Sequence, residues 1–133
     1  MKQGYYGAIE SLTTDNTDFR RVLYTGAHLQ LVLMTLQPGE AIGAETHDGH
    51  DQFFRFESGT GTVTIDETEY EVSDGDAVIV PAGALHNVTN TSDSETLTLY
   101  TIYSPPEHQK DVVHASKAEA DADDEHFDGV TSE

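Results

Sequence analysis

GDAVIVPAGALHNVTN, residues 75–90, combines two turns, a short strand and a histidine. Asp, Gly and Asp at positions 74–76 predict a turn, and the apolar residues 77–80 suit a short buried strand. Residues 81–83, Pro-Ala-Gly, then break that strand and redirect the chain, so that His86 begins the next strand. This arrangement predicts one half of a metal site.

The spacing in this stretch resembles the second motif of the cupin family, G-x5-P-x-G-x2-H-x3-N. The matching residues are Gly75, Pro81, Gly83, His86 and Asn90. The cupin family carries a first motif upstream, G-x5-H-x-H-x3,4-E-x6-G, and residues 39–59 resemble it with two departures. The family's first histidine is Glu45 here, and the family's glutamate is Gln52. The resemblance, which covers residues 30–105, implies a metal held by Glu45, His47, Gln52 and His86.

Strand geometry gives a physical reason for this set. Residues i and i+2 of a strand point to the same face, so Glu45 and His47 can aim into one interior while Thr46 points away. An Asp- and Gly-rich turn at residues 48–51 then lets Gln52 approach from a neighbouring strand. His86 would come from a third strand.

The ligand set determines which cofactor we expect. Two imidazoles, one carboxylate and one amide oxygen suit one divalent transition metal, Mn(II), Fe(II), Co(II), Ni(II) or Zn(II), with positions left for water or substrate. The family's set also has one carboxylate, so the ligand charge is unchanged although its position has moved.

Other roles are open for two of these side chains and for one neighbour. Glu45 is the weakest ligand, and it can instead serve as a catalytic base while water completes the metal shell. Gln52 alone would not indicate a ligand, and only the two spaced motifs together support it. His50, in the turn after His47, is a rival ligand, but its Gly-containing loop is more typical of a solvated side chain, so we leave it out.

Strand signals recur at short intervals up to residue 105, with Gly and Pro at the turns and no long helix. The predicted strands are residues 20–24, 28–36, 52–57, 62–66, 69–73, 77–80, 86–88 and 95–103. These signals predict an all-β antiparallel barrel or jelly roll, and the resemblance implies the cupin double-stranded β-helix. We expect an N-terminal arm at 1–19, the barrel at 20–105, and an acidic C-terminal tail at 106–133 that is mobile from residue 121.

Alternation along the strand that begins at Gln52 predicts the lining of the pocket. If Gln52 points inward, so do Phe54 and Phe56, which suits a partly aromatic ligand pocket or a plain core. Phe53 and Arg55 then face outward, where a second subunit would cover them. The resemblance implies a homodimer.

Composition limits the partners. The chain has 133 residues, 25 Asp and Glu, 6 Lys and Arg, and no cysteine. One domain is expected, disulfides and thiolate ligands are excluded, and a phosphate backbone would be repelled, so we expect no nucleic acid partner. The N-terminus carries no signal-peptide pattern and no stretch is apolar enough for a membrane span, so we expect a soluble cytoplasmic protein.

The distribution of the acids favours a salt-rich environment. Residues 111–133 hold eight of the 25 acids, and the other acids are spread over the body of the chain. An acidic tail alone would be a solvated appendage, whereas acids over the whole body with few lysines resemble proteins of salt-accumulating halophiles. The alternative is an ordinary acidic cytosolic protein.

Two functions fit the sequence. The first is a metal-dependent enzyme on a small organic substrate, an isomerase or lyase or an Fe(II) dioxygenase. The second is a non-catalytic metal- or sugar-binding module. The segment YTIYSPPEH, residues 100–108, resembles small cupins labelled mannose-6-phosphate-isomerase-like, and glutamine at the family's glutamate position also occurs in cupins that open unsaturated uronate sugars. The only arginines are Arg20, Arg21 and Arg55, and none is expected to hold a sugar phosphate.

Overall fold

Strands make up most of the chain, as the alternating pattern predicted, and the computed structural model describes residues 1–133. In chain order the elements are α1 (Ile9–Asp15), β1 (Arg20–Thr25), β2 (Gln30–Leu36), β3 (Asp51–Ser58), β4 (Thr60–Ile65), β5 (Thr68–Ser73), β6 (Ala77–Val80), β7 (His86–Asn90), β8 (Leu97–Ser104), β9 (Val113–His114) and α2 (Lys117–Ala122). The two helices are short, and neither is long and apolar enough to cross a membrane.

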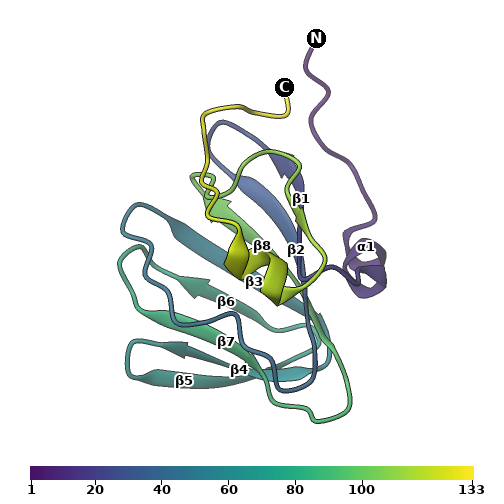
Figure 1. Ribbon diagram of the computed structural model, residues 1–133, viewed down its shortest axis with the longest axis vertical. Helices are drawn as coiled ribbons and strands as arrows, with labels where there is room; N and C mark the ends of the chain where they lie inside the picture. Colours follow the sequence, from purple (N-terminus) through teal and green to yellow (C-terminus); the bar gives the residue numbers. More distant parts are fainter.

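The strands form two antiparallel sheets. One has six strands in the order β6-β3-β8-β2-β1-β9, and the other has three in the order β5-β4-β7 (Figure 1). Non-consecutive strands such as β3 and β8 are neighbours, which is the connectivity of a jelly roll. The all-β fold class predicted from the sequence is confirmed.

The core lies between the two sheets. Phe54 and Phe56 point inward from β3 with exposures of 1% and 0%, and their rings stack 6.4 Å apart. Phe53 and Arg55 alternate onto the other face and stay partly exposed, as period-two reasoning predicted. The remaining buried apolar side chains come from both sheets, and they include Val32, Met34, Leu36, Val63, Val80, Val88, Leu97 and Leu99.

Gly59, the last glycine of the first motif, lies between β3 and β4 and permits close packing of this turn against the start of β8. Its φ is +89°, a region that side chains other than glycine rarely adopt. A Cβ at this position would collide with the carbonyl oxygen of Thr96. The motif therefore specifies glycine here for a steric reason.

The N-terminal segment contains helix α1, which the sequence did not predict. This helix contacts β2, β3 and β8. Its Leu12 lies beside Arg21 and Leu33, which point away from the core. Part of the outer sheet face is therefore covered by the chain itself, and the second subunit expected over Phe53 and Arg55 stays a prediction.

The C-terminal segment, residues 106–133, returns along the barrel. β9 pairs with β1, and α2 begins with a capping box between Ser116 and Glu119. Farther on, Ser132 exchanges hydrogen bonds with Thr25 of β1, at 2.8 and 2.9 Å. The acidic composition of the C-terminal segment did not predict these contacts. The mobility of residues 121–133 stays a prediction.

Candidate metal centre

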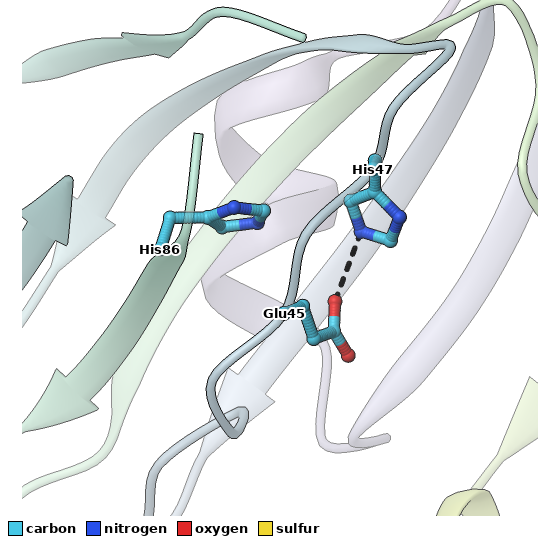
Figure 2. Close-up of side chains that lie close together, drawn as sticks. All are labelled: Glu45, His47 and His86. Atoms are coloured by element: carbon cyan, nitrogen blue, oxygen red, sulfur yellow. Dashed lines mark hydrogen bonds and ion pairs between the residues drawn. The ribbon is translucent and has the colours of Figure 1, made fainter. Parts of the chain in front are cut away.

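Three polar side chains converge inside the barrel. Glu45 and His47 come from the segment before β3, and His86 is the first residue of β7 (Figure 2). The Glu45 and His86 backbones exchange two hydrogen bonds of 2.9 Å, which join the two motifs. The segment that carries Glu45 and His47 is not a regular strand, because it forms only isolated bridges at Ala41 and Glu45. Thr46 nevertheless points out to solvent, as predicted.

The distances in this cluster suit a single cation. One potential ligand atom from each of Glu45, His47 and His86 lies within 4.8 Å of the others. The rings of His47 and His86 are 5.4 Å apart between centroids. Two imidazole nitrogens and a carboxylate oxygen at this separation are a donor set for a borderline divalent metal.

His86 is oriented by its own turn. The Nδ1 atom lies 3.1 Å from the carbonyl oxygen of Ala84 and donates to it, because a carbonyl can only accept. The other nitrogen, Nε2, is then left with a lone pair. This is the usual arrangement of a metal-binding histidine, in which a hydrogen bond to the second nitrogen sets the tautomer.

Glu45 and His47 form a hydrogen-bonded pair. Nε2 of His47 lies 3.0 Å from Oε2 of Glu45. Burial alone would raise the pKa of Glu45, but the hydrogen bond from His47 and the charges of His47, Arg20 and His86 outweigh it, so this pKa is lowered. The same hydrogen bond raises the pKa of His47, although burial opposes it. A proton and a metal ion therefore compete for this pair.

Gln52 offers a fourth oxygen. Its side chain is 3% exposed, and Nε2 donates to Oγ1 of Thr101 at 3.0 Å. Oγ1 of Thr101 donates in turn to the carbonyl oxygen of Phe53 at 2.7 Å. The Oε1 atom of Gln52 is buried and has no hydrogen-bond partner. Such an orphaned acceptor is costly unless something else binds it, so the donor set fits a cation.

His50 lies outside the cluster, but it is not the solvated side chain that its loop suggested. Its Nδ1 is 2.6 Å from the carbonyl oxygen of Pro105, and its Nε2 is 2.9 Å from Oε2 of Glu107. The same carboxylate oxygen of Glu107 is 3.8 Å from Nδ1 of His47. His50 therefore connects the predicted ligand loop to the start of the C-terminal segment.

Sequence reasoning missed three side chains around the cluster. Glu107 faces His47, and Tyr103 packs its ring edge to face with His47 at 6.0 Å. The third is Arg20, which is buried on the inner side of β1. Alternation with exposed Arg21 and buried Val22 was the available signal for Arg20, whereas no spacing indicated Glu107.

Known proteins resemble the chain along most of its length. The cupin domain family model matches residues 32–103. YrkC of Bacillus subtilis is 44% identical over 118 residues, which cover 84% of this chain and 63% of YrkC. L612 of Acanthamoeba polyphaga mimivirus is 40% identical over 111 residues, covering 81% of this chain and 69% of L612. The chain thus spans about two thirds of the length of these two relatives.

A solved structure extends the likeness to the fold. The crystal structure of BH2720 from Bacillus halodurans has a TM-score of 0.89 and 44% identity, and the match covers 91% of this chain and 96% of that one. With the motif geometry described above, these matches define the class: the chain belongs to the cupin family. Its fold is the double-stranded β-helix that the two motifs predicted.

Proposed function

We propose that this cupin is a metal-dependent enzyme acting on a small organic molecule. Glu45, His47 and His86 would hold one divalent transition metal, and Oε1 of Gln52 would supply a fourth contact. The observation that carries the proposal is the convergence of three ligand atoms within 4.8 Å. The buried Oε1 of Gln52, which has no hydrogen-bond partner, supports it. Charge and donor type suit Mn, Fe, Co, Ni or Zn.

The surrounding residues supply the rest of the chemistry. A bound metal of this kind would act as a Lewis acid for isomerisation or elimination, or as Fe(II) for a dioxygenase reaction. The Glu45 side chain is 36% exposed, against 14% for His47, so Glu45 is the member of the pair that solvent and substrate reach more easily. If Glu45 is not a ligand, its lowered pKa keeps it ionised and able to accept a proton.

A non-catalytic binding module is the second candidate. The observation that favours it is the crowding of the cluster by the C-terminal segment, where Glu107 lies against His47 and His50. The three cavities of the molecule are lined by other residues. A module that holds a metal or a sugar needs less room for substrate and product than an enzyme does.

Metal content tests the site. The protein should be purified without chelators or nickel affinity resin, and its metal measured by elemental analysis. We expect one metal per chain in the native protein and in His28→Ala, whose histidine is exposed and lies outside both motifs. His47→Ala and His86→Ala should lose most of it. Full occupancy in both of these variants would contradict the site.

Turnover separates the two candidate functions. The metal-loaded protein should be assayed for oxygen uptake and, by NMR, for interconversion of sugars, because a carbohydrate-derived substrate is our preferred class. Turnover that disappears in His86→Ala supports the enzyme. Metal binding without turnover in either assay favours the binding module. The homodimer and the cytoplasmic location stay predictions.

A further inference from the structure

Arg20 is a charged side chain buried in the barrel interior. It begins β1, where it pairs with Met34 of β2 on one side and with His114 of β9 on the other. Only 8% of it is exposed, whereas the next residue, Arg21, points to solvent. The guanidinium therefore lies among core side chains, with its carbon 5.4 Å from the centre of the Phe19 ring.

The guanidinium has no acidic partner. Arg21 pairs with Asp18 and Arg55 with Glu57, but Arg20 forms no ion pair. Its one hydrogen bond runs from Nη1 to Nδ1 of His114, at 3.3 Å. Nε of Arg20 is buried and has no partner.

An unpaired, buried guanidinium is energetically expensive. Arginine cannot lose its proton at accessible pH, and removing such a charge from water costs several kcal/mol unless an anion compensates. The chain has 25 carboxylates, yet none forms an ion pair with Arg20. Glu45 and Glu125 interact with its charge only at longer range. A direct anionic partner is therefore missing.

The C-terminal segment fixes the guanidinium in place. Because arginine can only donate, Nδ1 of His114 accepts, and the proton of His114 is on Nε2. That nitrogen is 2.9 Å from Oδ2 of Asp123 and donates to it. The Asp123–His114 pair thus occupies the Nη1 end of Arg20 and leaves the edge formed by Nε and Nη2 without a hydrogen bond.

Arg20 and the metal cluster share one interior. Met34, the β2 partner of Arg20, belongs to the same core cluster as Phe54, and the Phe54 ring packs against that of His86 at 6.3 Å. Tyr103 packs against His47 of the metal cluster, and its hydroxyl lies 3.4 Å from Nε2 of His108. His108, like His114, is bonded to a carboxylate of the C-terminal segment, Oε2 of Glu125 at 2.7 Å.

We propose that the free Nε–Nη2 edge of Arg20 binds the carboxylate group of the small molecule on which the cluster of Glu45, His47 and His86 acts. The substrate class is then a small organic acid, and this inference rests on the proposed function. Two parallel N–H groups match the two oxygens of a carboxylate. A single buried guanidinium balances one negative charge, which matches a carboxylate.

The Nε–H proton of Arg20 allows a direct test by NMR. The Zn(II)-loaded protein, which is diamagnetic, is titrated with glycolate and pyruvate and, as a neutral control, with glycolamide. We expect the Arg20 Nε–H signal to shift saturably with the two acids and not with the amide. The Nε–H of Arg55 serves as the internal reference, because this Nε is also buried without a hydrogen bond but already has a carboxylate, Oε1 of Glu57, at 3.3 Å. An unmoved Arg20 signal, or equal shifts at Arg55, would overturn the proposal, as would a stronger response to inorganic phosphate.

Two variants separate binding from a structural role. Arg20→Lys keeps the charge but loses the planar fork of two N–H donors. The affinity for glycolate and pyruvate should therefore fall by about tenfold or more. Arg20→Met should keep or raise the melting temperature in ligand-free buffer, because an apolar residue replaces an uncompensated charge. A clear fall in that temperature would mean that Arg20 serves the fold and would refute the anion site.

Metal analysis of the same samples keeps the two hypotheses apart. One zinc per chain with no response at Arg20 removes this inference and leaves the proposed function standing. A response at Arg20 without stoichiometric metal removes the proposed function and, with it, the assignment of the acid as a substrate of that cluster.

Discussion

Glu45 is the residue at which this cupin departs most from the motif, and its two possible roles respond differently to one substitution. Glu45→Gln keeps the size and an oxygen donor but removes the charge. If Glu45 binds the metal, affinity should fall by at least the roughly 10–100-fold that loss of a supporting residue costs, because no other carboxylate lies in the set. If it is a base, metal affinity should hold and turnover should collapse.

Metal titration and activity assays on Glu45→Gln distinguish these outcomes, with Glu45→His as the matched control. Glu45→His restores the family's usual ligand, so it should bind metal in both cases. Unchanged metal content together with unchanged activity in Glu45→Gln would show that Glu45 has neither role.

Single residues also show how far the sequence predicted the site. The motif spacing predicted that Glu45, His47 and His86 lie together. This succeeded because Glu45 and His47 are two residues apart and the Glu45 backbone pairs with that of His86. Gln52 is buried as expected, with its oxygen free, but its role as a ligand stays a prediction. Glu107 was missed because it reaches the site through long-range packing, which leaves no local spacing to detect. Arg20 was missed because its alternation with Arg21 and Val22 indicates burial and not a role.

At the scale of elements, prediction succeeded where alternation was strong. The hairpin of β4 and β5 and the inward face of β3 follow from period-two patterns. Helix α1 is seven residues long and has no side-chain cap, so its sequence carries little signal, and its contacts with the sheet stabilise it instead. β9 has two residues and is equally invisible in the sequence.

The C-terminal segment should make stability depend on pH through His108. Burial lowers the pKa of His108 despite its hydrogen bond to Glu125. The unfolded chain therefore takes up this proton first as the pH falls, so stability that is complete above about pH 6.5 is lost progressively toward the folded pKa. The pKa of Glu125 is also lowered, since hydrogen bonds from His108 and the Gln109 N–H outweigh burial, and its contribution is lost only below about pH 4.5.

Thermal melts between neutral pH and about pH 5 measure this effect. His108→Gln cannot take up the proton, so its melting temperature should fall less over this range than that of the native protein. His126→Gln is the matched control, because His126 is 72% exposed, and it should behave like the native protein. Equal slopes in the native protein and His108→Gln would exclude His108 as the titrating group. The raised pKa of His47 acts in the opposite direction and is common to all three proteins.

At the scale of the whole molecule, the net charge of −19 should make the fold depend on salt. The acids are spread over the body, so their mutual repulsion acts over a Debye length of about 30 Å at 0.01 M salt and about 3 Å at 1 M. We expect the melting temperature to rise markedly along a KCl series from tens of millimolar to molar. A melting temperature that stays constant or falls along the series would remove the proposed adaptation to high salt.

The two histidine–carboxylate pairs of the C-terminal segment have an evolutionary consequence. Residues 45–86 encode the metal cluster, whereas His114 with Asp123 and His108 with Glu125 orient Arg20 and Tyr103 from a separate stretch of chain. If Arg20 binds the ligand as proposed, substitutions in that stretch would change what the barrel recognises and leave Glu45, His47 and His86 in place. Grafting residues 106–133 from one homologue onto the barrel of another should then exchange ligand preference in a single step.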